Sequence, residues 1–375
     1  MATDKQHKIP NAPNLRFPEF EGEWGLYTLG EICSEFKSGK NIKADNIVSE
    51  GSIPVYGGNG LRGYTDSWNH KGEYVLIGRQ GALCGNVRYV SGNTYITEHA
   101  IAVKASEGNN TKYLQYLFEF MDLGQYSDQS AQPGLAVNKL LKLKAQIPHL
   151  NEQIKIANLF ASLDTRITTQ IGAIEDYKRL KGYLIDKLLN QQGCMMKVGD
   201  VIVQKTERNR KGNDYTVLSV SNQKGFIAQS EQFEEREVAS EDKSCYKIVR
   251  RDDFAYNPAR INVGSIARLI NYDCGIVSPM YICFHSDETV LPEFLGYFFE
   301  SSYFATEVDK RLEGSVRLCL SYDGLCDIPI QIPNVDKQRA IIQRLDAVSQ
   351  KIVLEEQCLD LYKQQKAYLL KNMFV

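Results

Sequence analysis

The chain repeats itself. Residues 147–189 reappear without a gap as residues 332–374, so matched residues lie 185 positions apart. The identical pairs include Ile147 and Ile332, Pro148 and Pro333, Gln153 and Gln338, Tyr177 and Tyr362, and Lys181 and Lys366. Two copies of this period fill almost the whole 375-residue chain. A protein built as two similar halves has two similar sites, which favours a bipartite partner over a single active site.

The composition is that of a folded protein, with 43% hydrophobic and 24% charged residues. No apolar run approaches the ~20 residues that cross a bilayer, and the polar N-terminus lacks the apolar stretch of a signal peptide. The nine cysteines are odd in number and form no C-x-x-C pair, which predicts reduced thiols. We therefore expect a cytoplasmic protein without a membrane partner. With a net charge of −2, binding to nucleic acid would need local basic patches.

Each copy of the repeat predicts a long helix of ~35–40 residues, which would start near a capping residue at Asn151 or Asp336. The runs contain no proline, and their apolar residues lie alternately four and three positions apart, which is the spacing of a coiled-coil seam. The residues expected to pair the helices are Ile156, Phe160, Leu163, Ile167, Ile174, Leu184, Ile341, Leu345, Val348, Ile352, Leu359 and Leu369.

So narrow an apolar seam must pack against another helix, and the simplest partner is the helix of the other copy. We favour an antiparallel pair, because it places the two globular segments at opposite ends of one rod. A one-heptad stagger would then oppose Lys181 to Glu355 and Gln170 to Lys366, which would relieve the cost of polar groups in the seam. The alternative is two independent amphipathic helices, each packed on its own domain.

The two globular segments share a frame. Glu73–Arg79 and Asp253–Arg260 are strand-like runs that end in arginine, and Tyr113–Glu119 and Phe294–Glu300 each predict a short amphipathic helix. Short β-branched and aromatic runs between glycines predict a mixed α/β (α+β) fold. The expected layout is one domain at 1–150, a helix at 151–192, a similar domain at 193–335 and a helix at 336–375. The whole would have an internal pseudo-twofold.

The loops of both segments are rich in residue types that contact nucleic acid. Arginine can donate two hydrogen bonds to guanine, and asparagine or glutamine can bridge the edge of adenine. Lysines and hydroxyls suit phosphates. The candidates are Lys37, Lys40, Asn59, Arg62, Tyr64, Arg79, Gln80 and Gln132 in the first segment, and Lys205, Arg208, Asn209, Arg210, Lys211, Asn222, Arg260, Asn262 and Arg317 in the second. An ordinary solvated loop is the alternative for any one residue, but the set, paired between the halves, favours nucleic-acid contact.

Signals for catalysis are weak. Gly58–Gly63 matches G-x-G-x-x-G, but more loop follows it instead of a helix, so a glycine-rich hairpin is the better interpretation. Tyr256–Ala259 lacks the second proline and the aromatic residue of a methyltransferase N-P-P-Y motif, and Glu241–Lys243 lacks the strand-borne aspartate of a metal nuclease. The five histidines are dispersed, without metal-ligand spacing. We expect no catalysis, no cofactor and no metal site.

At this point the layout resembles the specificity (S) subunit of type I restriction-modification systems over essentially the full length. Pro13–Trp24 is similar to that family's lead-in, and Tyr74–Val87 to its arginine-containing strand and turn. Ile147–Gln153 and Ile332–Gln338 resemble its I-P-x-x-x-E-Q helix entry. The second copy departs from the pattern at Lys337, which replaces the usual acid, and Asn257-Pro-Ala replaces a glycine turn.

The resemblance implies two target recognition domains, each reading one half of a split site on double-stranded DNA, with a spacer fixed by the helices. It also implies two methyltransferase (M) subunits and outer restriction (R) subunits, which would carry S-adenosylmethionine, ATP and Mg. The M subunits could dock on the outward helix face, at Lys178, Arg179, Tyr183, Lys363 and Tyr368. Two alternatives remain: a non-catalytic coiled-coil scaffold that binds no DNA, and a fragment of a fused nuclease-methyltransferase that is active alone.

Overall fold

The computed structural model describes residues 11–128, 134–189, 193–222, 224–232, 243–314 and 318–375. The chain divides into two compact units. Unit 1 comprises Met1–Ile171 and Gln357–Val375, and unit 2 comprises Gly172–Glu356. Each unit therefore holds one globular segment together with part of each long helix. Among the described residues, no helix is both long and apolar enough to cross a membrane.

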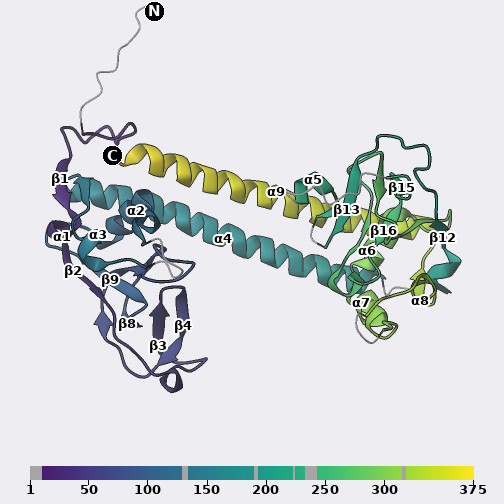
Figure 1. Cartoon of the computed structure of the whole chain (residues 1–375), viewed down its shortest axis with the longest axis horizontal. Helices are drawn as coiled ribbons and strands as arrows, with labels where there is room; N and C mark the ends of the chain where they lie inside the picture. Colours follow the sequence, from purple (N-terminus) through teal and green to yellow (C-terminus); the bar gives the residue numbers. More distant parts are fainter. Residues whose placement is uncertain (1–10, 129–133, 190–192, 223, 233–242, 315–317) are drawn as a thin grey trace, which may run out of the picture. The chain divides into compact units, whose positions relative to one another are not determined.

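Unit 1 begins with a strand and alternates short strands with short helices before the first long helix (Figure 1). Its elements are β1 (Gly25–Thr28), α1 (Leu29–Ile32), β2 (Cys33–Ser38), η1 (Ala44–Asn46), β3 (Ile53–Gly57), β4 (Gly60–Thr65), β5 (His70–Lys71), β6 (Tyr74–Gly78), β7 (Val87–Val90), β8 (Asn93–Ile96), β9 (Ala100–Ala105), α2 (Thr111–Met121), η2 (Leu123–Tyr126), α3 (Val137–Leu140), β10 (Lys144–Ile147) and the start of α4 (Leu150–Leu189).

Unit 2 follows the same plan and ends in the second long helix. Its elements are β11 (Cys194–Lys197), η3 (Val198–Asp200), β12 (Ile202–Lys205), β13 (Val217–Ser221), β14 (Gly225–Ala228), α5 (Gln229–Gln232), β15 (Lys247–Arg250), β16 (Phe254–Tyr256), η4 (Ile261–Val263), β17 (Ile266–Arg268), β18 (Cys274–Val277), β19 (Ile282–Ser286), α6 (Pro292–Phe299), α7 (Ser302–Asp309), α8 (Tyr322–Cys326), β20 (Pro329–Ile332) and the start of α9 (Val335–Met373).

The sheets of the two units match strand for strand. Unit 1 has the orders β1-β10, β2-β9-β6-β7 and β4-β3-β8-β5, and unit 2 has β11-β20, β12-β19-β16-β17 and β14-β13-β18-β15. The parallel pair recurs as well, as β3 with β8 and β13 with β18. The predicted mixed α/β fold, with two similar sheet-containing domains, two long antiparallel helices and an internal pseudo-twofold repeat, is confirmed.

In each unit, the largest hydrophobic cluster joins the domain to the long helices. In unit 1, Tyr113 and Leu117 of α2 pack with Phe160 of α4 and with Phe374, which follows α9. The ring of Phe374 stacks on that of Tyr113 with centroids 5.6 Å apart. In unit 2, Leu295 of α6 shares a core with Leu188 of α4 and Leu345 of α9. The helices therefore pack on the domains as well as on each other.

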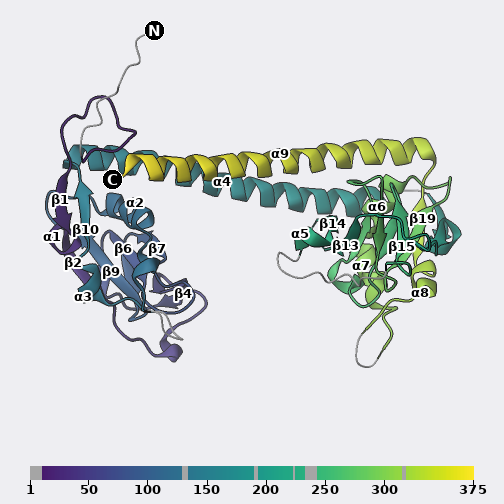
Figure 2. The same cartoon turned by 45° about the horizontal axis from the view of Figure 1, so that its top comes forward.

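Within each unit, part of α4 lies beside the opposite part of α9 (Figure 1 and Figure 2). Each of the twelve residues expected in the seam is buried or half-buried. In unit 2 the helices also meet through charged side chains. Lys178 Nζ lies 2.7 Å from Glu356 Oε1, and Lys351 Nζ lies 5.8 Å from the centroid of the Tyr177 ring.

The predicted pairing of the seam lysines was wrong. Lys181 forms its ion pair with Glu300, just after α6, at 2.6 Å, and not with Glu355. Lys366 pairs with Glu119 of α2 and with Asp164 of α4, each at 2.8 Å, and not with Gln170. Both lysines lie where the helix pair meets a globular domain, so each reaches a glutamate of that domain, and Lys366 also reaches Asp164 on the facing helix.

The predicted helix caps were also wrong. The helices begin directly after their proline turns, and Asn151 and Asp336 lie inside the first turn. At α9 the side-chain oxygen of Asn334 accepts from the Lys337 amide at 3.0 Å. At α4 the backbone carbonyl of His149 accepts from the Glu152 amide at 3.0 Å. The chain turns into each helix immediately after the proline, which moves the capping position two residues earlier.

Candidate nucleic-acid interface

Two loops of unit 1, one after β6 and one between β8 and β9, converge beside the β3–β4 hairpin. The amide of Arg79, after β6, donates to the carbonyl of His99 at 2.9 Å, and the amide of Thr97 donates to the carbonyl of Tyr56 at 2.8 Å. A Cβ at Gly58, in the hairpin turn, would lie only 2.7 Å from the His99 carbonyl oxygen and 3.7 Å from the Arg79 nitrogen. The missing side chain at Gly58 is what lets the loops approach this closely.

Several predicted contact residues meet at this edge. Asn59 and Arg62 are exposed on the hairpin, Gln80 is exposed beside it, and Arg79 is half-buried. Lys40 joins them, because its amide donates to the carbonyl of Ile96 at 3.0 Å, next to the Thr97–His99 turn. Arginine, asparagine and glutamine residues therefore share one edge of unit 1. These are residue types whose side chains can hydrogen-bond to the edges of DNA bases.

Two other predicted residues of unit 1 have partners within the protein. Lys37 on β2 pairs with Glu35 at 3.0 Å. Tyr64 is half-buried on β4, where its backbone exchanges hydrogen bonds with Val48 at 2.8 and 2.9 Å. Gln132 lies outside the described residues, although Gln80 forms a bridge with the neighbouring Gly134.

A polar cluster next to Lys37 joins the two four-stranded sheets of unit 1. His70 Nε2 is 3.1 Å from Glu35 Oε1, and the hydroxyl of Tyr74 donates to the other oxygen of Glu35 at 3.1 Å. Burial lowers the pKa of His70 although the Glu35 carboxylate opposes that effect. Burial and the neighbouring Glu35 raise the pKa of Tyr74 to about 12. This cluster holds β2, β5 and β6 together and does not form part of the loop edge.

Unit 2 repeats the juxtaposition of hairpin turn and loop. Asn222 is exposed in the β13–β14 turn, and its Cβ lies 3.8 Å from the Cβ position of Gly264, which ends η4. Arg260 and Asn262, both exposed, belong to that loop after β16. The β13–β14 turn corresponds to the β3–β4 turn, and the loop after β16 corresponds to the loop after β6. The two units therefore present the same edge with different side chains.

The remaining predicted residues of unit 2 lie elsewhere. Lys205 pairs with the buried Asp253 at 2.6 Å. Asn209 is only 1% exposed, and its side-chain amide donates to the carbonyl of Asn213 at 2.9 Å and accepts from the Asn213 amide at 3.0 Å. Its amide groups are therefore used inside the protein.

The loop that follows β12 carries three exposed predicted cations, Arg208, Arg210 and Lys211. Arg208 forms a bridge with Lys247 on β15, at the opposite edge of the sheet from the β13–β14 hairpin. These three residues form a basic loop apart from Asn222 and Arg260. Arg317 lies outside the described residues.

Sequence reasoning missed two cations at the edges. Arg88 on β7 is exposed, and a Cβ at Gly60 would lie 3.1 Å from its guanidinium. Lys224 is exposed in the β13–β14 turn, two residues after Asn222. Arg88 carries only a weak local signal, an exposed charge within the strand run Val87–Val90. Lys224 lay within a loop already singled out.

The described residues contain no group of three or more histidine, cysteine, aspartate or glutamate side chains that could hold a metal ion. The nine cysteines are free thiols, and burial raises the pKa of Cys33 and Cys283 to about 12, so these two thiols stay protonated. The edges at the β3–β4 and β13–β14 turns present hydrogen-bond donors and acceptors on loops.

Comparison with known proteins points to one family. A type I restriction modification DNA specificity domain matches residues 21–175. The specificity subunit of the EcoprrI type I restriction enzyme of Escherichia coli is 42% identical over 178 residues, which is 46% of this chain and 44% of that protein. A Haemophilus influenzae protein named as a type I restriction enzyme specificity subunit is 23% identical over 347 residues, 87% of each chain. In sequence, the chain is therefore similar to type I restriction-modification specificity subunits.

Two solved structures resemble this chain in fold over nearly its whole length. The crystal structure of a type I restriction-modification S subunit from M. genitalium matches with a TM-score of 0.66, covering 97% of this chain and 99% of that one at 17% identity. A chain from a study of complex assembly and conformational transition of the type I system matches with a TM-score of 0.56 at 13% identity, covering 94% and 97%. The match to the E. coli relative spans less than half of that protein's length.

Proposed function

We propose that this chain is the sequence-reading subunit of a type I restriction-modification complex and recognises a bipartite target in double-stranded DNA. The observation that carries the proposal is the repeated edge, in which a hairpin turn meets a loop rich in arginine and asparagine once in each unit. The side chains differ between the units, with Asn59, Arg79 and Gln80 at one edge and Asn222, Arg260 and Asn262 at the other. Different residues on one frame suit two different half-sites.

In this proposal, residues 1–150 and 193–335 are the two target recognition domains, and residues 151–192 and 336–375 are the helices that set the unread spacer. Dimeric DNA-binding proteins use fixed geometry in the same way to select half-site spacing. The basic loop at Arg208–Lys211, together with Lys40 and Lys224, would contact phosphates and add affinity without reading sequence.

The partners would be two M subunits, with R subunits outside them. Tyr183 and Tyr368 are equivalent under the 185-residue repeat and are 60% and 62% exposed, one in each unit. Large aromatic side chains at matched exposed positions suit a partner that binds in two copies. S-adenosylmethionine, ATP and Mg would be bound by those partners, and this chain would direct their chemistry without performing it.

The direct test is to sequence methylated adenines in DNA from cells that carry this chain with its cognate methyltransferase. We expect methylation at two short motifs separated by a fixed unread spacer, and none when the chain is omitted. Methylation that is independent of the chain, or a single uninterrupted motif, would refute the proposal. Reaction by the purified chain alone, supplied with S-adenosylmethionine or Mg, would instead favour a fused enzyme fragment.

A further inference from the structure

An equivalent lysine near the C-terminal end of each long helix joins the helix pair to a globular domain; we call this group of contacts the junction. In unit 1, Lys366 of α9 contacts Glu119 of α2 and Asp164 of α4, both at 2.8 Å. The hydroxyl of Tyr116 donates to Asp164 at 2.9 Å, and Lys366 lies 5.4 Å from the centre of the Tyr116 ring. One cation thus connects three helices through two carboxylates and an aromatic ring.

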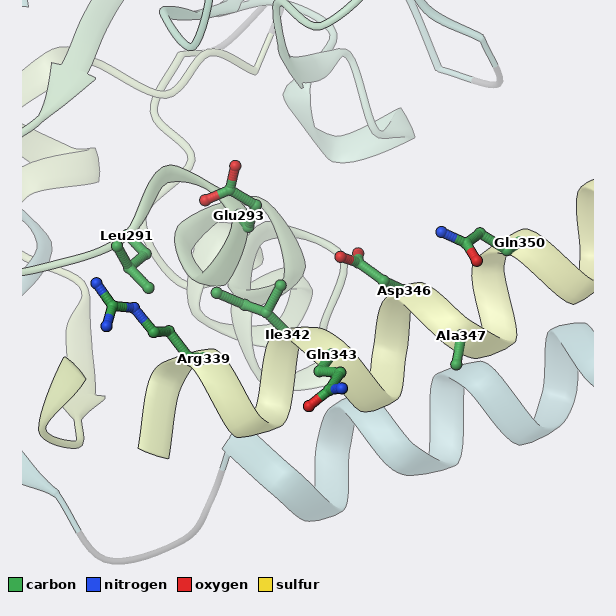
Figure 3. A pocket seen from close by; sticks show the side chains of 8 residues that line it. All are labelled: Leu291, Glu293, Arg339, Ile342, Gln343, Asp346, Ala347 and Gln350. Carbon is green, nitrogen blue, oxygen red and sulfur yellow. The ribbon is translucent and has the colours of Figure 1, made fainter. Parts of the chain in front are cut away.

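In unit 2 the equivalent lysine makes a more open junction. Lys181 of α4 contacts Glu300 at 2.6 Å and lies 5.2 Å from the centre of the Tyr297 ring. The hydroxyl of Tyr297 donates to Asp346 at 2.6 Å and lies 3.3 Å from Ser349 Oγ. Figure 3 shows Asp346 projecting from α9 on the side of the helix that faces Glu293.

The two junctions correspond residue by residue and differ in their acids. Under the 185-residue repeat, Lys181 matches Lys366, Ser349 matches Asp164, and Asp346 matches Ala161. The carboxylate bound by the tyrosine in unit 1 therefore also binds the lysine, whereas in unit 2 the tyrosine uses a different carboxylate, Asp346, one turn away.

The two junctions also differ in the solvent exposure of their glutamate side chains. The lysine side chains are 19% and 21% exposed, but the domain glutamates differ, with Glu119 at 22% and Glu300 at 50%. Burial lowers the pKa of Lys366, but its hydrogen bonds to Asp164 and Glu119 outweigh that effect and raise its pKa above the ordinary value. The unit 1 junction is therefore the better shielded and the more strongly coupled of the two.

We propose that Lys366 and Lys181 are positioning residues that fix the angle between each recognition domain and its helix pair, and that the unit 1 junction holds this angle more tightly than the unit 2 junction. The inference rests on the proposed function. In unit 1 the β3–β4 hairpin lies at the end of the domain away from α4 (Figure 1), so a small rotation at the junction displaces the reading edge. A looser junction would therefore let the complex accept a wrong spacer while reading the same half-sites.

The test uses the complex of the full chain with its cognate methyltransferase. Duplexes carry both half-sites with the native spacer or with one base pair added or removed, and the methylation rate is measured on each. For Lys366→Met, which keeps an apolar stem without the charge, we expect the ratio of native-spacer to altered-spacer rates to fall about tenfold, the scale of losing a hydrogen bond to a charged group. Lys366→Arg should restore most of the ratio.

Reciprocal swaps give a matched pair of variants. Asp346→Ala with Ser349→Asp places the unit 1 acids in unit 2, and we expect the spacer ratio to rise about threefold, the scale of one partly exposed ion pair. Ala161→Asp with Asp164→Ser makes the reverse exchange in unit 1 and should lower the ratio. These substitutions introduce neither proline nor glycine into the helices, and circular dichroism checks that each variant is folded.

The half-site sequences must stay unchanged in every variant, which distinguishes positioning from base contact. Unchanged spacer ratios in folded Lys366→Met and in both swaps would overturn the inference alone. A wild-type complex that shows no preference for any spacer would overturn the proposed function, and this inference with it.

Discussion

At the residue scale, hydrogen bonds of its backbone set the position of Arg79. Its backbone joins three loops: its amide bonds to His99, and its carbonyl accepts from the Leu135 amide at 2.9 Å and from the Cys84 thiol at 3.3 Å. A backbone held at several points fixes where the Arg79 side chain leaves the edge, and its guanidinium can make the bidentate contact that suits guanine.

We expect Arg79→Ala to relax the requirement for one base in one half-site, at a cost of about 1–3 kcal/mol in discrimination if the contact is bidentate. The methylated motif of the variant, compared with the wild-type motif, measures this. Arg260→Ala is the matched variant and should affect the other half-site only. Equal weakening on all sequences would assign Arg79 to a phosphate instead.

Gln153 and Gln338 lie at equivalent positions near the starts of α4 and α9 and make equivalent hydrogen bonds. The side-chain oxygen of Gln153 accepts from the Asn110 amide at 2.9 Å, and its nitrogen donates to the Pro148 carbonyl at 2.9 Å. Gln338 accepts from the Leu291 amide at 2.8 Å and donates to the Pro333 carbonyl at 2.9 Å. Both glutamines are almost fully buried, so each one ties its helix start to the loop before α2 or α6.

Gln153→Ala should lower the free energy of unfolding of unit 1 by about 1–3 kcal/mol, because it leaves buried backbone groups without partners. The chain has two tryptophans, Trp24 and Trp68, and both belong to unit 1, so denaturation followed by tryptophan fluorescence reports on that unit. Gln338→Ala, in unit 2, is the control and should leave this transition nearly unmoved. Equal effects of the two variants would contradict the assignment.

The His70 cluster gives unit 1 a dependence on pH. Burial lowers the pKa of His70. For Glu35, burial raises the pKa, but hydrogen bonds from Lys37 and Tyr74 outweigh it and leave the pKa below its usual value. Because both folded-state values lie below the unfolded ones, the unfolded chain binds more protons as the pH falls, and the free energy of unfolding decreases.

We expect the loss at His70 to begin near its unfolded pKa of 6.5, and the loss at Glu35 to begin near 4.5, as the pH falls. Urea denaturation followed by tryptophan fluorescence from pH 8 to pH 4 would show it. His70→Gln should flatten the curve above pH 5. A stability of unit 1 that rises on acidification would contradict the sign.

At the element scale, the helices were the most predictable parts and their ends the least. The four-and-three spacing from Ile156 onward and from Ile341 onward predicted both long helices, because periodic apolar residues reflect a local geometry. The cap at Asn334 and the partners of Lys181 and Lys366 depend on how the helices meet the domains. Those contacts join residues far apart in the chain, so seam spacing alone could not reveal them.

A seven-residue insertion in each helix tests their proposed role as a ruler. Inserted after Ile171 and after Glu356, a heptad preserves the seam and lengthens both helices equally. We expect a longer spacer with both half-sites unchanged, read by sequencing methylated sites in cells. A four-residue insertion is the control, because it rotates the following seam residues out of register and should abolish modification. Altered half-sites in the heptad variant would exclude the ruler.

At the scale of the whole molecule, the main feature is the internal duplication, which repeats the order of strands and helices. The gapless 185-residue repeat covers the helices and the strands just before them, yet in the structure the strand order matches from β1 to β10 and from β11 to β20. The two globular segments keep one strand order although their loops carry different side chains. Their buried strands need only apolar side chains of suitable size.

The sequence by itself determined that the chain is two copies of one plan, with long amphipathic helices after mixed α/β segments, since these properties follow from spacing and composition. Tertiary structure alone decided which loops form an edge. Asn59 and Arg79 come together because β3 pairs with β8, and because β6 and β9 are neighbours in the adjoining sheet. Asn209, as polar as either of them, is turned inward by the same folding. Strand order is a long-range property that local patterns of residue type do not encode.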